Sequence, residues 1–198
     1  MKTRVYAGTA LALALASGAA AQDFAITVEA VNQGTTNAAN HAPVGPSRSN
    51  PANALGAPND MFFSLGMGGS MVLGFGGEFG TSVTVWETTV GNIANHPEKA
   101  DVFVGYGASA ETAEFWFVDT VFNTADGIPL SLAPVGAVSG RSTYNFVRIV
   151  DTSNPAALPE LADGFDVDAV AVHLVIPAPA SAALLATAGL VGVRRRRR

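Results

Sequence analysis

Short segments in which apolar side chains alternate with small or polar ones recur along this chain, and they constrain its fold more than any other feature. In residues 24–31, Phe24, Ile26 and Val28 occupy every second position, which is the pattern of a strand that buries one face. Comparable segments follow at residues 70–75, 82–90, 100–106, 115–122, 144–151 and 167–176. Clusters of glycine, proline and asparagine separate them, as turns do between short strands. This arrangement predicts an all-β fold, a single β-sandwich.

The composition agrees with such a fold and leaves little room for helices. Glycine contributes 21 residues and proline 11, while only 14% of the residues are charged, which suits strands joined by turns better than a helical bundle. Residues 34–59 hold few apolar side chains and predict a long surface loop. Residues 109–114 and 155–161 each predict at most a short helical turn. The sequence contains no cysteine, so no disulfide stabilises the fold.

The first 21 residues have the three parts of a secretory signal peptide. Lys2 and Arg4 precede an apolar run at residues 5–16, and alanine occupies positions 19–21. A basic start, a short apolar core and small residues at the cleavage site define a signal that is removed on export. We therefore expect cleavage before Gln22 and a mature body that begins there.

Residues 22–176 carry a large negative charge that the whole-chain value hides. They hold all 16 acidic residues but only four basic ones, Arg48, Lys99, Arg141 and Arg148, so their net charge is −12, against −5 for the whole chain. Such a surface repels nucleic-acid phosphates and anionic lipid. It favours solubility outside the cell or the binding of divalent cations. We expect no nucleic-acid partner.

The end of the chain combines a proline motif, an apolar run and a basic cluster. The motif contains Pro177, Ala178 and Pro179, and residues 177–193 are mostly apolar, which is close to the shortest length that spans a membrane as a helix. The chain then ends on five arginines, Arg194, Arg195, Arg196, Arg197 and Arg198. Arginines after an apolar helix hold that end on the cytoplasmic side.

In this order the three features resemble the PEP-CTERM family of protein-sorting signals, in the variant with a Val-Pro-x-Pro-Ala-like motif. In this chain Ala178 occupies the position of the glutamate in the Pro-Glu-Pro motif that gives the family its name. The resemblance implies that residues 176–198 are a sorting tail, held in the inner membrane of a Gram-negative bacterium until an exosortase-type processing enzyme cuts near the prolines. The mature protein would then lie at the cell surface or outside the cell. A simple membrane anchor is the alternative.

The body carries a second resemblance, spread over several stretches. These are residues 51–58, 63–70, 83–87, 146–151 and 163–170. Together they resemble the extracellular domain that often precedes such sorting tails, whose strand pattern is similar to that of galactose-binding-like jelly rolls. The resemblance implies one domain at residues 22–175, and it implies no catalytic activity.

Three carboxylates near the end of the body are the clearest chemical signal. Asp166 and Asp168 lie two apart in a predicted strand and so share a face, and Asp163 lies at the turn before them. Hard oxygen ligands that converge at a strand edge predict a weak calcium site. The alternative is a solvated strand end or a partner for Arg148. No other cofactor is expected.

Glu87 and Arg148 are predicted to form a structural ion pair. Glu87 shares a strand face with Val83 and Val85, so its carboxylate would approach the core and need a counter-charge. Arg148 lies within a similar apolar segment and is the best candidate for that counter-charge.

No catalytic constellation stands out in the sequence. No serine lies in a nucleophile elbow, and no two of His41, His96 and His173 have the spacing of zinc ligands. The glycines at 105 and 107 follow a strand but precede no crossover helix, so a dinucleotide site is not expected.

These observations predict an exported, non-enzymatic structural protein of the cell surface or extracellular matrix, associated with exopolysaccharide and sorted through its tail. The first alternative is a carbohydrate-binding module, in which aromatic rings stack on sugars. The rings available are those of Trp86, Tyr106, Trp116 and Tyr144. The second alternative is an extracellular hydrolase.

Overall fold

The structure is a computed structural model, and it describes residues 22–89 and 91–175. In these ranges the strands are β1 (Asp23–Phe24), β2 (Thr27–Asn32), β3 (Phe63–Ser64), β4 (Ser70–Glu87), β5 (Lys99–Tyr106), β6 (Glu114–Phe122), β7 (Asp126–Ser131), β8 (Tyr144–Asp151) and β9 (Asp166–Leu174). The helices are α1 (Ala133–Ser139) and the short 3-10 helices η1 (Pro46–Arg48), η2 (Pro51–Ala54), η3 (Ile93–Asn95) and η4 (Pro155–Ala157). The all-β prediction is confirmed. The predicted signal peptide and sorting tail lie outside the described residues.

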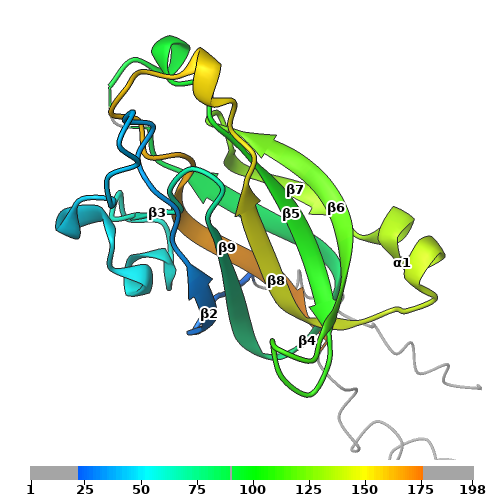
Figure 1. Ribbon diagram of the computed structural model, residues 1–198. Helices are drawn as coiled ribbons and strands as arrows, with labels where there is room; N and C mark the ends of the chain where they lie inside the picture. Colours follow the sequence, from blue (N-terminus) through cyan, green and yellow to red (C-terminus); the bar gives the residue numbers. More distant parts are fainter. Residues whose placement is uncertain (1–21, 90, 176–198) are drawn as a thin grey trace, which may run out of the picture.

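Strand β4 belongs to both layers of the sandwich. Its residues 70–74 pair with β8 on one side and with β2 on the other, whereas residues 82–87 pair with β9 and β7. The register shifts between these halves, where Gly76 has a φ of 73°, and the strand bends there as bulged strands do. One layer therefore contains β2, β4, β8, β5 and β6, and the other contains β3, β1, β9, β4 and β7 (Figure 1).

Side chains from the inner faces of the two layers form the core. Leu73 and Val147 are partners across β4 and β8, and neither is exposed to solvent. In β5, Val102 and Val104 are fully buried while Phe103 between them is only half-buried. In β5 the alternation in the sequence therefore determines which face enters the core, because successive side chains of a strand point to opposite faces.

The loop between β2 and β3 covers part of β9. Within it, η2 begins at Pro51, and the side chain of the preceding Asn50 accepts a hydrogen bond from the Ala52 N–H at 3.2 Å and so caps the helix. Ala54 of η2 is fully buried and η2 contacts β9. The predicted long loop at residues 34–59 is confirmed. It shelters β9, which is buried on both faces from Asp166 to Val172.

Four features of the fold differ from the sequence prediction. Residues 24–31 were expected as one strand that buries one face, but they lie in β1 and β2, and β2 is mostly exposed. Residues 70–75 and 82–90 were expected as two strands, but both lie largely in β4. Strand β7 was not predicted because Gly127 and Pro129 are typical of turns, although an edge strand tolerates them. Helix α1 was not predicted either. It has seven residues with Gly140 as its C-cap, and it lies beside β6 (Figure 1). Within the described ranges, no helix is long and apolar enough to cross a membrane.

Candidate functional site

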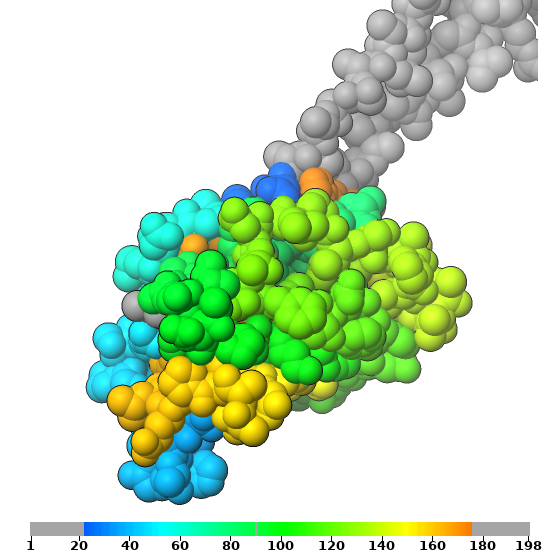
Figure 2. Space-filling view, turned by 90° about the horizontal axis from the view of Figure 1, so that it is seen from above, coloured from blue at the N-terminus to red at the C-terminus, as the bar shows by residue number. Residues whose placement is uncertain are grey.

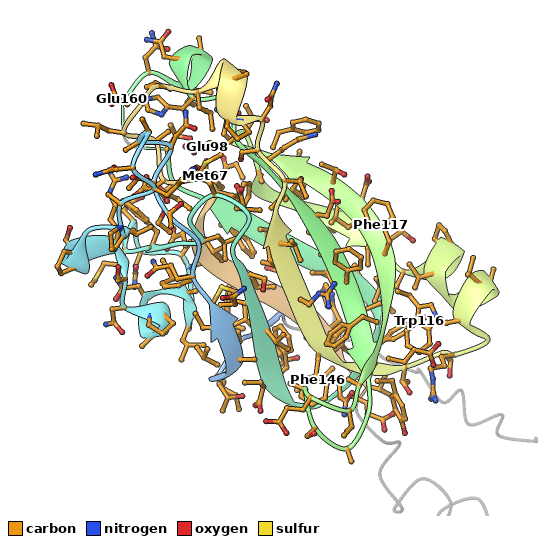
Figure 3. The ribbon with its side chains drawn as sticks, viewed as in Figure 1. Met67, Glu98, Trp116, Phe117, Phe146 and Glu160 are labelled. Carbon is orange, nitrogen blue, oxygen red and sulfur yellow. The ribbon has the colours of Figure 1, made fainter. Side chains whose placement is uncertain are left out.

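Loops and strand ends enclose a cavity of about 180 Å³ at one end of the sandwich. We call it the acidic pocket, and its lining consists of Arg48, Thr89, His96, Glu98, Pro159, Leu161, Ala162, Asp163 and Asp166. Figure 2 looks onto this end and shows segments near residues 40, 100 and 155 side by side. Figure 3 places Glu98 at the same end of the molecule.

The strand directions explain why residues so distant in sequence meet there. Strand β4 ends at Glu87, which pairs with Val167 near the start of β9. Strand β5 begins at Lys99, next to Glu98, and pairs with the end of β8 at Asp151. The connecting loops therefore gather at one end of a rigid sandwich, which is where binding residues are usually found.

An ion pair between Arg48 and Asp163 forms one wall of the pocket. Arg48 Nη1 lies 2.7 Å from Asp163 Oδ1, and the Asp163 side chain is only 8% exposed. The guanidinium also lies over the Phe62 ring, 5.2 Å from its centroid. The hydroxyl of Ser64 donates to the Asp163 carbonyl oxygen at 2.8 Å. These contacts hold Arg48 in place. Its guanidinium therefore pairs with Asp163, at 2.7 Å, more closely than with Asp166, at 3.9 Å.

Asp166 is a buried carboxyl group with one unsatisfied oxygen. Its side chain is 4% exposed, and its Oδ2 lies 3.9 Å from Arg48 Nη1. Its Oδ1 is buried and has no hydrogen-bond partner among the described residues. Burial, followed by the charge of Asp163, raises the pKa of Asp166 to about 8, because burial disfavours the ionised form.

Glu98 is a second buried carboxyl group in the pocket wall. The residue is 3% exposed, and its Oε1 lies 3.8 Å from His96 Nδ1. Burial, followed by the charges of Asp166 and Glu87, raises the pKa of Glu98 to about 9. Burial also raises the pKa of Glu87 to about 7. At neutral pH the empty pocket therefore keeps protons on Glu98 and Asp166, so both carboxyl groups can donate as well as accept hydrogen bonds.

Asp151 is another buried carboxyl group, and its hydrogen bonds to the turn before β4 and to the segment before β9 are satisfied. Its carboxylate accepts hydrogen bonds from the Gly68 N–H at 2.9 Å, the Phe165 N–H at 3.0 Å and the Ser153 hydroxyl at 2.6 Å. It thereby ties the turn before β4 to the segment that precedes β9. Three donors satisfy this buried carboxylate.

The predicted calcium site at Asp163, Asp166 and Asp168 is not formed. Asp168 accepts hydrogen bonds from the backbone N–H groups of Asn59 at 3.1 Å and Asp60 at 3.3 Å, so it anchors the loop before β3 instead. Asp163 is engaged by Arg48. Residues 22–89 and 91–175 contain no group of three His, Cys, Asp or Glu side chains arranged to hold a metal ion.

The predicted ion pair between Glu87 and Arg148 is also wrong. The Thr89 hydroxyl lies 2.9 Å from both carboxylate oxygens of Glu87. Arg148 pairs with Val72, at the other end of β4. Because β4 changes layers between Val72 and Glu87, the two charged residues belong to different layers. An alternation pattern cannot reveal that change.

Arg148 instead belongs to an aromatic surface on the outer side of β5 and β6. Its guanidinium lies 4.7 Å from the centroid of the Phe103 ring and 5.0 Å from that of Phe115, within the range of cation–π attraction. Phe117, labelled in Figure 3, packs edge-on against Phe103 with 5.7 Å between centroids and is 51% exposed. The sequence analysis missed this surface because it considered only tryptophan and tyrosine.

The four aromatic residues proposed to stack on sugars do not form a platform. Tyr144 is 1% exposed and packs edge-on against Trp116, with 5.9 Å between ring centroids. Tyr106 lies beneath the guanidinium of Arg141, 3.8 Å from ring centroid to charge centre. Trp86 is on β4 where it pairs with β9, in the other layer. These rings mostly serve packing.

Two residues of the pocket were missed by sequence analysis. Arg48 carried one signal, since it is one of only four basic residues in a strongly acidic body. Glu98 carried none, because it lies in a polar loop before β5 with nothing to mark its burial. Of the predicted metal ligands, the structure brings Asp163 and Asp166 together in the pocket and places Asp168 elsewhere.

Chemically, the pocket can bind a small hydroxylated or cationic group. Carboxyl groups accept from hydroxyl or ammonium donors, and Arg48 and Thr89 can donate to oxygen atoms. Leu161, which is 79% exposed, and Pro159 add apolar surface to the same lining. The volume is smaller than the roughly 300–1,000 Å³ of pockets for drug-sized ligands, so the pocket accommodates one ring or one end of a longer chain.

Comparisons with known proteins give no relative in sequence. No protein-family model matches the chain, and no curated protein matches it significantly. Solved structures do match. A truncated AlyQ with CBM32 and alginate lyase domains has a TM-score of 0.47 at 13% identity, covering 80% of this chain and 34% of that one. The CBM32 of AlyQ in complex with 4,5-unsaturated mannuronic acid has a TM-score of 0.45 at 12% identity, covering 77% and 97%.

A third match is the family 32 CBM of C. perfringens NanJ in complex with galactose. Its TM-score is 0.43 at 9% identity, covering 77% of this chain and 98% of that one. This chain spans about a third of the AlyQ structure that includes the lyase domain. At these identities and TM-scores the likeness assigns no activity to this chain.

Proposed function

We propose that this chain is an exported, non-enzymatic protein of the cell surface or extracellular matrix, and that its β-sandwich binds carbohydrate through the acidic pocket. Export rests on the signal-like residues 1–21 and the sorting-like residues 176–198. Carbohydrate binding rests on one observation, the end pocket lined by Asp166, whose Oδ1 is buried without a partner among the described residues.

The chemistry of sugars fits that wall. A sugar ring presents several hydroxyl groups, each of which both donates and accepts hydrogen bonds, and a C–H face that contacts apolar side chains. Asp166 and Glu98 offer acceptors, Arg48 offers a donor, and Leu161 offers apolar surface. A hydroxyl that donates to Asp166 Oδ1 would satisfy the buried oxygen, and unsatisfied buried polar atoms are costly.

The same geometry explains why binding without turnover is proposed. A hydrolase would need its carboxyl groups on either side of a scissile bond with solvent access for water. Here Asp163 and Asp166 both lie within 4.0 Å of Arg48 Nη1, at 2.7 Å and 3.9 Å, so they do not lie on opposite sides of a bound linkage. The pocket is therefore suited to hold the end of a glycan rather than to span a linkage.

The test is the binding of the purified protein to a panel of neutral, acidic and amino-containing glycans, followed by titration calorimetry of those retained. Replacing Asp166→Asn or Arg48→Met is expected to weaken binding at least about tenfold, because each removes a hydrogen-bonding group from the pocket lining. Glu111→Gln is the matched control, since it removes one negative charge from an exposed loop that follows the other end of β5.

Two outcomes would overturn the proposal. One is retention of no glycan from the panel by a folded protein. The other is equal loss of binding in Glu111→Gln and Asp166→Asn, which would show that bulk charge, and not the pocket, holds the glycan. Release of reducing ends or of acid groups from any panel member would instead favour a hydrolase.

A further inference from the structure

The acidic pocket contains more carboxyl groups than its one guanidinium can pair with. Glu98, Asp163 and Asp166 line it, and the charges of Glu87 and Asp151 reach Glu98 strongly enough to raise its pKa. Among the basic side chains of the body, only Arg48 lines the pocket. Arg141 and Arg148 lie over aromatic rings elsewhere.

A second observation is independent of the charge count. The Asp166 side chain is 96% buried, since 4% of it is exposed, and its Oδ1 has no partner among the described residues although it belongs to the pocket lining. Arg48 cannot supply that partner, because its Nη1 lies 2.7 Å from Asp163 and 3.9 Å from the other oxygen of Asp166. Within the described residues this oxygen is therefore left without a donor, which a ligand in the pocket can supply.

From this geometry we infer that the preferred ligand of the pocket is an amino sugar with a free amine, whose ammonium group donates to Asp166 Oδ1 and Glu98. The inference rests on the proposed carbohydrate function and specifies its substrate class. An ammonium carries three donors and a positive charge, which a neutral hydroxyl lacks. An ammonium group can therefore donate to the unpaired oxygen of Asp166 and also balance the charge of the surrounding carboxyl groups when they ionise.

A metal ion fits this pocket less well than an organic cation. The described part of the chain has no group of three suitable ligands that converge on one point. Arg48 already pairs with Asp163 at 2.7 Å, so one of the carboxylates that a divalent ion would need is occupied. The apolar part of the lining, Pro159, Leu161 and Ala162, contributes nothing to a metal but contacts the carbon atoms of a sugar ring.

The charge of the whole body favours the same class of ligand. Residues 22–176 have a net charge of −12, which attracts a polycation over a distance of about one Debye length, roughly 8–10 Å at physiological salt. A polysaccharide with many free amines is such a polycation. The pocket would then bind one sugar unit while the surrounding surface raises the local concentration of the chain.

Binding of an ammonium should also release protons at pH 7. Burial raises the pKa of Asp166 to about 8 and that of Glu98 to about 9 in the empty pocket, and a bound cation lowers both by favouring the ionised forms. The charged and titratable groups around them are Arg48 from η1, Glu87 from β4, His96 from the loop before β5, Asp151 from β8 and Asp163 from the loop before β9. The number of protons released on binding therefore measures whether the ligand contacts Asp166 and Glu98.

The experiment compares oligomers of glucosamine and of N-acetylglucosamine at pH 7, by calorimetry in two buffers that differ in ionisation enthalpy. The two ligands share the ring and the linkage and differ in the charge at one nitrogen. We expect the free amine to bind at least about tenfold more tightly, with proton release seen as a buffer-dependent enthalpy. In Asp166→Asn and Glu98→Gln the preference should shrink towards equality, while Glu111→Gln should keep it.

The possible failures are distinguishable. If folded protein binds both oligomers equally, or binds only neutral glycans, the amine inference is overturned and carbohydrate binding stands. If no glycan binds, the proposed function fails as well. If millimolar calcium displaces the amine and raises the melting temperature, the pocket is a metal site and the inference is overturned. Near-ultraviolet circular dichroism of each variant shows whether a loss of binding reflects unfolding.

Discussion

At the scale of single residues, two buried aspartates illustrate different uses of the same side chain. Asp151 accepts three hydrogen bonds, two of them from backbone N–H groups, and so it stabilises the connection between two loops. Asp166 is equally buried but leaves one oxygen without a partner. Since burying an unpaired carboxyl group is unfavourable, it is retained where function requires it.

We expect the two positions to respond oppositely to substitution. Asp151→Ala should lower the free energy of unfolding by about 3 kcal/mol, because it leaves buried backbone donors unsatisfied. Asp166→Asn should change it by less than about 1 kcal/mol or increase it, because an amide of the same shape replaces a carboxyl group that already lacks one hydrogen-bond partner. Urea denaturation measures both values. Equal losses would contradict the assignment of Asp166 to ligand binding.

Buried carboxyl groups also predict how stability changes with pH. The pKa values of Asp166 and Glu98 are raised in the folded protein to about 8 and about 9, from ordinary values of 3.8 and 4.5. A raised pKa means that the folded state binds the proton more tightly than the unfolded state. The contribution of these two groups to the free energy of unfolding is therefore complete below pH 4, and it is lost as the pH rises to 9.

The corresponding measurement is the melting temperature from pH 4 to pH 9, in the absence of ligand. Relative to the wild type, the double variant Asp166→Asn with Glu98→Gln should lose less stability as the pH rises, because neither new side chain titrates. Parallel profiles for the two proteins would show that these groups are not the source of the dependence.

At the scale of elements, the turn between β3 and β4 joins the pocket loops to the sandwich. The Gly34 N–H donates to the Leu65 carbonyl at 2.8 Å, and the Met67 N–H donates to the Thr35 carbonyl at 2.7 Å. The backbones approach so closely that a methyl group on Gly69 would collide with the Leu65 carbonyl oxygen. The turn includes Gly66 and Gly68, whose φ angles are 73° and 69°, and Figure 3 shows Met67 at the same end of the molecule as Glu98.

We therefore expect Gly69→Ala to destabilise the protein by about 3 kcal/mol or more, since the clash involves backbone atoms on both sides. Gly77→Ala is the matched control, because its added methyl group would lie 3.5 Å from the flexible side chain of Leu174. That change should lie within about 1 kcal/mol of the wild type and can be stabilising. Chemical denaturation of the two variants compares them directly, and similar values would show that the turn is less tightly packed than the structure indicates.

At the scale of the whole molecule, residues 22–175 contain one continuous core and no cysteine. We expect this segment to fold without reducing agent, metal or the flanking segments, because its stability comes from the packing of two layers. Far-ultraviolet circular dichroism should show β structure with one cooperative thermal transition. A predominantly helical spectrum would reject the fold.

The flanking segments predict how the whole chain is processed. Mass spectrometry of the mature protein from its native host should find Gln22 as the first residue and no residue beyond about position 180. Replacing Arg194 to Arg198 by serine should leave precursor misplaced, because the arginines orient the apolar segment. A mature mass that retains the tail would favour a simple membrane anchor.

The sequence by itself indicated most of the strands, and for strands such as β5 it also indicated the inward face, because alternation with a period of two is a local property that burial of one face imposes. It also indicated the acidic character of the body. It could not indicate that β4 crosses between layers, and for this reason the pairing of Glu87 with Arg148 was wrong.

Only the tertiary structure decided which carboxyl groups meet. Asp166 and Asp168 share one strand, yet loop residues Asn59 and Asp60 engage Asp168, whereas Arg48 approaches Asp163 and Asp166. These partners lie about 100 residues or more away in sequence, as the Arg48–Asp163 separation of 115 shows. The pocket arises because antiparallel strands of different layers end on the same side, and no local pattern encodes such long-range proximity.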